Sequence, residues 1–324
     1  MKKKLLLGLV TLGAASMLCG FDSAETADSV AQKMQEASSG VAGMTANAAL
    51  NVDAALNVGD GTTNSTIALL LTCDYDMATV LDPLSMQMDM AMHMSMMGQS
   101  EDMNMKMYMV PAEDGSLDVY TYTEDSASGE AGWSYESTDS IDISEITSAL
   151  EAMNLGSLSD WGIVFELAPE AADFNGTECY LLSTTIDTNT LSQILNKVSE
   201  LAGEDLSADE DVSMVLAMME GLKLNLQYYV DTTTYLPVSV HLDMNDSDLT
   251  MINQYIQLMA NSGEEGQTST MELVLNDVSM DMTPVYGTID PITVPQEAID
   301  AVASGEAEDL GLGDTLELVE ETIE

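Results

Sequence analysis

The sequence contains no arginine, and only seven of its 324 residues are lysine. Three of these lysines lie at positions 2–4, so the rest of the chain has four lysines against 56 aspartates and glutamates, and the formal net charge is −49. A surface of this sign repels polyanions, and the chain lacks the guanidinium group that usually binds phosphate or carboxylate in a bidentate manner. We therefore expect no nucleic-acid partner.

Groups suited to catalysis are also scarce. The chain has two histidines, His93 and His241, and each lies at a polar position of an alternating segment. A histidine on the polar face of a strand is a poor general base, because a base must be held in a pocket beside its nucleophile. No GxSxG, HExxH, phosphate-loop or GxGxxG motif occurs in a usable context. We predict that the chain is not an enzyme and has no cofactor.

Long apolar runs are confined to the N-terminus. Lys2–Lys4 precede an apolar stretch, Leu5–Leu18, that is too short to span a bilayer comfortably. A positive start followed by a short apolar run is typical of a cleaved secretory signal. We predict a signal peptide over residues 1–18 and export of the rest of the chain.

The end of this signal indicates a lipid anchor. Ser16-Met17-Leu18-Cys19 resembles a bacterial lipobox, which predicts acylation of Cys19, for example with palmitate. Leu18 departs from the lipobox pattern, where a small residue is usual, and the alternative is an ordinary signal peptide cut after Ser16. With the anchor, residues 19–27 are a tether, and the protein lies at the extracytoplasmic face of the bacterial cell membrane.

Two cysteines remain after Cys19, and both lie in strand-like segments. An exported domain can keep disulfides, so Cys73 and Cys179 form either a disulfide or two buried free thiols. No CxxC or Cys/His spacing predicts a zinc site.

Apolar residues follow a helical period over residues 26–44 and then switch to a period of two. Strict alternation is clearest in a methionine-rich hairpin, which places ten methionines of residues 86–109 on one face and polar residues on the other. Further hairpins and helices follow, including a helix near 249–260 and a strand with a bulge at Asn276-Asp277. The order predicts an α+β fold, in which a large curved antiparallel sheet, an unclosed half-barrel, packs against several helices. This domain covers residues 28–302, and an acidic tail covers residues 303–324.

The layout resembles the LolA-like envelope lipoproteins of the LppX and LprG type. The resemblance rests on Cys19, the helix 26–44, the hairpin 84–110, Val119-Tyr120-Thr121-Tyr122 before Trp133, Asp231–Tyr235 before Leu236-Pro237, and Ile292–Ala298. It implies an unclosed barrel whose concave face packs helices and, in several members, accepts acyl chains. The family has no catalytic residues, so none are assigned here.

The methionine face has three interpretations. It is a core covered by the helices near 190–220 and 249–260, as in a structural or interaction lipoprotein, or it binds an apolar small molecule or lipid, because thioethers adapt to irregular shapes. The predicted ligand face is Met86, Met88, Met90, Met92, Met94, Met103, Met105 and Met107. The third interpretation is copper(I) binding by Met92-His93-Met94, although His93 has the opposite parity and neighbouring methionines are about 6.7 Å apart.

Calcium is a further alternative. Residues 243–248 begin like a calcium loop, but Asp248 stands where glycine is required and Gln254 replaces the terminal glutamate. The acidic segment with Glu204, Asp205, Asp209, Glu210 and Asp211 is expected to be solvated. We predict no metal site, and the sequence carries no signal for an oligomeric state.

Overall fold

The computed structural model describes residues 26–59, 64–112, 116–126, 129, 131–138, 163–202, 216–261, 270–305 and 307–309. The signal peptide and Cys19 lie outside these residues, as do the acidic segment 204–211 and most of the predicted tail. None of the described helices is both long enough and apolar enough to cross a membrane.

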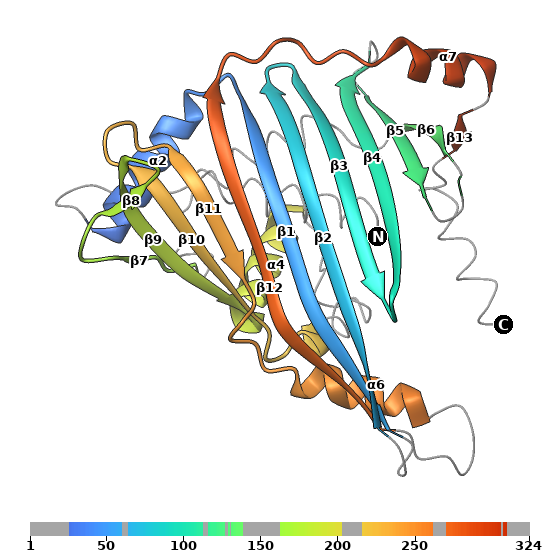
Figure 1. Cartoon of the computed structure of the whole chain (residues 1–324). Coiled ribbons are helices and arrows are strands. Elements are labelled where there is room, and N and C mark those ends of the chain that lie inside the picture. Colours follow the sequence, from blue (N-terminus) through green and yellow to red (C-terminus); the bar gives the residue numbers. More distant parts are fainter. Residues whose placement is uncertain are drawn as a thin grey trace.

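The described residues of the first half of the chain form one helix followed by long hairpins (Figure 1). Its elements are α2 (Ala27–Ser39), β1 (Gly43–Gly59), β2 (Asn64–Leu81), β3 (Leu84–Met96), β4 (Gln99–Pro111), β5 (Leu117–Asp125) and β6 (Ala131–Thr138). The second half is β7 (Glu166–Leu167), β8 (Ala172–Phe174), β9 (Thr177–Asp187), α4 (Thr188–Ala202), β10 (Lys223–Asp231), β11 (Pro237–Asp243), α6 (Thr250–Asn261), β12 (Thr270–Gly287), α7 (Gln296–Ser304) and β13 (Glu308–Asp309).

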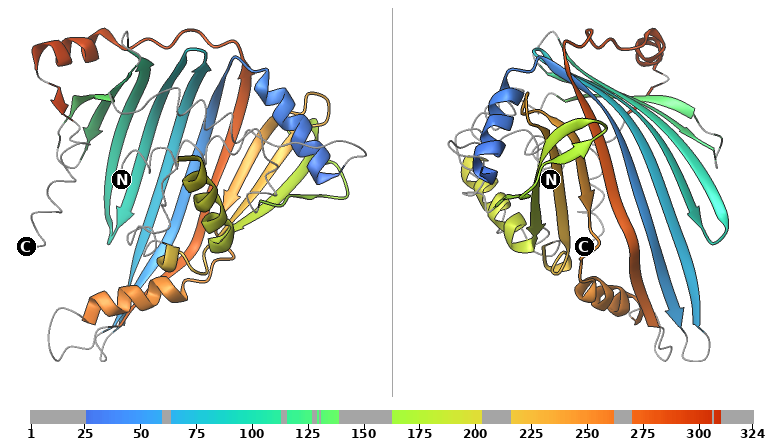
Figure 2. Two further views of the ribbon diagram at one scale, coloured as in Figure 1. Left: turned by 180° about the vertical axis from the view of Figure 1, so that it is seen from behind. Right: turned by 60° about the vertical axis from the view of Figure 1, so that its left-hand side comes forward.

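All described strands belong to one 13-stranded sheet, ordered β13-β6-β5-β4-β3-β2-β1-β12-β11-β10-β9-β7, with β8 paired to β9. Every pairing is antiparallel except that of β13 with β6. The two ends, β13 and β7, do not pair with each other, so the sheet stays open. It curves around the side that carries α2, α4 and α6 (Figure 2). This confirms the predicted α+β fold with an unclosed antiparallel sheet.

Helix α2 is shorter than the sequence pattern predicted. Thr26 caps it, because the Thr26 hydroxyl accepts a hydrogen bond from the backbone N–H of Ser29 at 3.2 Å. The helix ends at Ser39, and β1 has already begun at Gly43. The predicted end at residue 44 is wrong because the apolar residues after Gly40 follow the strand period and pair with β2 and β12. Gly43 is needed there, since a Cβ would lie 2.6 Å from the carbonyl oxygen of Thr79.

The best-packed core lies between α2 and the β9–β11 part of the sheet. Val30 and Met34 of α2 are fully buried, and they belong to one cluster with Leu182, Tyr228 and Val240 from three neighbouring strands. Spacing of Val30 and Met34 by four residues places both on one face of the helix. Hydrophobic burial at this contact fixes α2 on the concave side of the sheet.

The bulge predicted in the last long strand is confirmed. Asp277 pairs with Asp53, but the next residue of β1, Ala54, pairs with Leu275, so Asn276 is the extra residue. Because of this extra residue, Leu275 and Val278 face the same side of the sheet although they are three positions apart in the sequence. The methionine hairpin closes through two residues with positive φ, Met97 at 55° and Gly98 at 79°, as two-residue hairpin turns require.

The last described elements, α7 and β13, lie at the opposite edge of the sheet from α2. After β12 the chain crosses the ends of the central strands to α7, which contacts β6 (Figure 1). Glu308 and Asp309 then form β13 beside Ser134 and Tyr135 of β6. Glu308 and Asp309, which fall within the predicted tail of residues 303–324, therefore pair with the sheet.

Candidate functional site

The methionines of β3 and β4 form paired rows on one face of the sheet. Register places four pairs directly opposite each other: Met86 with Met109, Met88 with Met107, Met90 with Met105, and Met92 with Met103. These residues and Met94 are the methionine face. The side chain of Met109 is buried, and those of the other eight are partly buried. The alternation inferred from the sequence is therefore observed strand by strand.

This face continues from β4 to β9, because directly paired residues on neighbouring strands point to the same side. One row can be followed from the methionines to the core under α2. It runs through Met105, Met90, Tyr75, Ala48, Met282, Val240, Tyr228 and Leu182. The register therefore places the methionines on the concave side of the sheet, the side on which Figure 2 shows α2, α4 and α6.

Three of the described helices, α2, α4 and α6, contact the other half of this concave side, whereas α7 contacts β6. Helices α2 and α4 contact β9, and α6 contacts β12. These contacts lie several strands away from β3 and β4 in the sheet order. The covered core and the methionine face are thus two parts of one apolar surface, one closed by helices and the other partly buried.

The polar side chains on this side of the sheet include Tyr75 and Cys73, of which the sequence analysis considered only Cys73, as a possible disulfide partner. Tyr75 and Cys73 are on β2, and they pair with Met90 and Met92 of β3. The phenol of Tyr75 is hydrogen-bonded to the thiol of Cys73. Burial, followed by this hydrogen bond, raises the pKa of Tyr75 to about 12. The phenol is therefore a neutral hydrogen-bond donor at physiological pH.

Both histidines lie on the opposite, convex face, which is polar over the central strands and carries the aromatic side chains of Tyr120, Tyr122 and Trp133 over β5 and β6. His93 pairs with Asp102 across the β3–β4 hairpin, with 2.6 Å between the imidazole Nδ1 and the carboxylate Oδ1. The Nδ1 atom of His241 lies 2.8 Å from Oδ1 of Asp281. His93 thus points away from the methionines on either side of it in the sequence, as its parity predicted.

Acidic and amide side chains on the convex face are bonded to each other. The amide of Asn51 donates to the carboxylate of Asp277 at 2.7 Å, and this bond contributes most to lowering the pKa of Asp277. In the loop that begins like a calcium site, Asp248 accepts from the backbone N–H of Thr250, at the start of α6. The Asp248 carboxylate therefore satisfies a backbone donor at the start of α6. Within the described residues, no three His, Cys, Asp or Glu side chains are grouped to hold a metal ion.

The two cysteines do not form a disulfide, and each is a buried free thiol. Cys73 faces the methionines, whereas Cys179 pairs with Asp231 on the opposite face. Five strand-to-strand steps separate β2 from β9, which places the backbones roughly 24 Å apart. A disulfide needs Cα atoms within about 7 Å, so the bridge considered from the sequence is wrong and the alternative of two free thiols holds.

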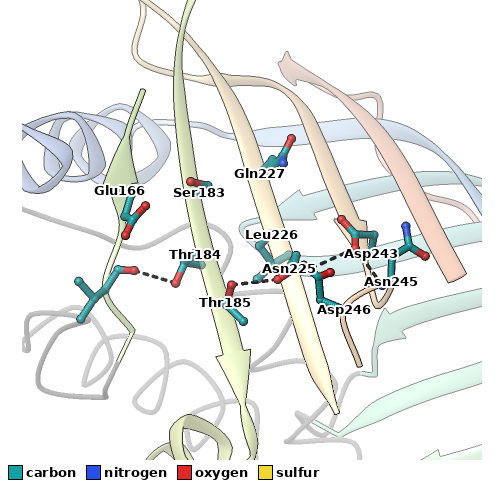
Figure 3. A pocket seen from close by; sticks show the side chains of 11 residues that line it. Glu166, Ser183, Thr184, Thr185, Asn225, Leu226, Gln227, Asp243, Asn245 and Asp246 are labelled. Carbon is teal, nitrogen blue, oxygen red and sulfur yellow. Dashed lines mark hydrogen bonds between the residues drawn. The ribbon is translucent and has the colours of Figure 1, made fainter. Parts of the chain in front are cut away.

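A polar cavity of about 540 Å³ lies over β7, β9, β10 and β11 (Figure 3). Its lining is mostly hydroxyl, amide and carboxylate groups: Val164, Glu166, Ser183, Thr184, Thr185, Asn225, Leu226, Gln227, Asp243, Asn245 and Asp246. Several of these groups bond to each other, as in the chain from Thr185 through Asn225 to Asp243 at 2.9 and 3.1 Å. The sequence analysis did not find this cavity, because its residues come from four segments and share no motif.

Comparisons with known proteins give a partial family match. Residues 26–147 match a family of unknown function, DUF6612. No curated protein matches the chain. The matched part contains α2 and strands β1–β6, so it includes the complete methionine face.

Several solved structures resemble the chain at low identity. The lipoprotein LppX from Mycobacterium tuberculosis shares 9% identity, with 82% of this chain and 96% of that chain covered and a TM-score of 0.33. LprF from Mycobacterium bovis shares 12% identity, with coverages of 80% and 91% and a TM-score of 0.27. A putative outer membrane lipoprotein-sorting protein domain from Vibrio parahaemolyticus shares 9%, with 83% and 96% covered and a TM-score of 0.20. Placement in the LolA-like family stays a prediction.

Proposed function

We propose that the protein is an exported, lipid-anchored envelope protein that binds an apolar ligand, a lipid or acyl chain, on the methionine face. The observation that carries this proposal is the register that joins the methionines of β3 and β4 to the helix-covered core as one concave apolar surface. Partial burial of eight of the nine methionines fits a surface that a ligand completes. Flexible thioethers adapt to chains of different shape.

Binding is tested with the purified mature protein, by extracting it with solvent and by titrating it with 1,6-diphenylhexatriene, an uncharged apolar fluorophore. We expect co-purified lipid and saturable uptake of the fluorophore. Replacing Met90 and Met105, which face each other, by glutamine should weaken uptake about tenfold, because the surface offered to the ligand becomes polar. Neither extracted lipid nor saturable uptake would leave a closed structural or interaction module as the better account.

The matched control uses the next pair of the same hairpin. Ala91 and Asn104 also face each other, but on the convex side. The double substitution Ala91→Gln and Asn104→Gln should leave uptake unchanged, because it adds the same side chains to the polar face. Equal losses in both double variants would show that the hairpin, and not its methionine face, matters.

The anchor is the second part of the proposal. Acylation at Cys19 would hold a strongly acidic chain at a membrane that its own surface does not attract. Cells fed an alkyne analogue of palmitate should label the protein, and Cys19→Ser should abolish the label and release the chain from the membrane fraction. Labelling that survives Cys19→Ser would place the lipid elsewhere.

A further inference from the structure

Tyr75 is a hydrogen-bond donor in the central part of the methionine side of the sheet, where its phenol reaches further from the backbone than the hydroxyls of Thr79 on β2 and Thr121 on β5. It lies between Ala48 on β1 and Met90 on β3, and its described partner is the thiol of Cys73. Sulfur is a weak acceptor, so this bond is easily exchanged for one to a carbonyl, ether or hydroxyl oxygen. The phenol is protonated at neutral pH, and burial raises its pKa further, to about 12.

The charges of the sheet are distributed unevenly between its faces. Between β12 and β3, the described residues that share the methionine side are uncharged. Lys106, Lys223, His93 and His241 have the opposite parity in their strands and therefore lie on the convex side. The ammonium group of Lys33 is 3.1 Å from the hydroxyl of Tyr235, at the β9 end of the molecule. No described strand cation is therefore placed to neutralise an anion on the methionine face.

Carboxylates, in contrast, do share this side near its margin. Glu101 pairs with Met94 close to the hairpin turn, and Glu136 pairs with Val119, next to Met109. An anionic ligand would lose its hydration, gain no counter-charge from the described strands and meet these carboxylates. An uncharged ligand meets none of these costs.

We propose that the methionine face selects an uncharged lipid, such as a fatty alcohol or ester, whose oxygen accepts a hydrogen bond from the hydroxyl of Tyr75. This inference rests on the proposed function and adds the ligand class and its polar anchor. Fatty acids and phospholipids with net negative headgroups are then rejected. The shared chemistry of accepted ligands is one uncharged oxygen acceptor on an apolar chain.

The test uses full-length mature protein loaded with 1,6-diphenylhexatriene at pH 8 and displaced by decane, decan-1-ol, methyl decanoate or decanoate. Decan-1-ol and methyl decanoate should compete at least about tenfold better than decanoate, which is ionised at this pH. Tyr75→Phe should weaken the binding of decan-1-ol and methyl decanoate about fivefold, which is the usual contribution of one hydrogen bond. The binding of decane should not change. Tyr120→Phe is the matched control, because Tyr120 lies on the convex side of β5 and pairs with Tyr108 and Tyr135.

Each outcome bears on a distinct claim. If the unmodified protein does not bind diphenylhexatriene, the proposed function and this inference are overturned together. If the protein takes up the fluorophore but decanoate competes as strongly as decan-1-ol, only the inference that the ligand is uncharged is overturned. Equal effects of Tyr75→Phe on decan-1-ol and decane would overturn the role of the hydroxyl as anchor.

Discussion

Replacing Ala48 by lysine should destabilise the protein by about 3–5 kcal/mol, the cost of an uncompensated buried charge. Ala48 is 5% exposed and lies in the centre of the concave row, between Met282 and Tyr75. A lysine there has no described counter-charge on its face and displaces well-packed apolar groups. Urea denaturation followed by circular dichroism measures the change as a lower midpoint.

The neighbouring residue gives the matched control. Ala49 is exposed on the convex face, where it pairs with Asp281 on β12 and Asp74 on β2. Ala49→Lys places a cation between two carboxylates, so its stability should equal or slightly exceed that of the unmodified protein, with the gain reduced by salt. If the two variants were equally stable, the assignment of the faces would be wrong.

Leu182→Ala should cost about 3 kcal/mol or more of stability, because it empties the centre of the core under α2. The Leu182 side chain is completely buried, and it belongs to the cluster with Val30, Met34 and Tyr228. The loss combines the transfer free energy of the removed methyl groups with the cavity that remains. The free energy of unfolding, extrapolated from urea titration, is the quantity to compare.

Leu70 provides the reference for the same substitution in a different environment. It is 39% exposed and pairs with Asp53 and Ser95 on the convex face. Leu70→Ala should change the free energy of unfolding by less than about 1 kcal/mol. A Leu182→Ala variant no less stable than Leu70→Ala would show that α2 does not close a core against β9.

Alternation in the sequence was sufficient to predict the sheet. Parity alone assigned the methionines and His93 to opposite faces, and it located the bulge at Asn276, because a strand has only two faces and a one-residue slip reverses them. The end of α2 was harder, because Val41 fits a helical face as well as it fits the approach to a strand. Pairing with β2 and β12 decides where β1 begins, and these partners are distant in the sequence.

The position of the Tyr75 hydroxyl beside the methionines and the distance between the two cysteines could not be predicted from alternation. Tyr75 and Cys73 have the same parity as the apolar residues of β2, and only the pairing with β3 shows that they adjoin Met90 and Met92. The distance between Cys73 and Cys179 depends on the strand order, which places β1, β12, β11 and β10 between them. Strand order is set by long-range packing and leaves no local mark in the sequence.

The central claim is that the ligand lies on the methionine face, and photo-crosslinking tests it most directly. A long-chain alcohol carrying a diazirine is bound to the purified protein, irradiated, and its adducts are located residue by residue by mass spectrometry, with decan-1-ol as competitor. The account predicts competed adducts on Met88, Met90, Met105, Met107 or Tyr75. Adducts confined to residues of opposite parity, such as Ala91, Asn104 or Lys106, or adducts that decan-1-ol does not reduce, would contradict it.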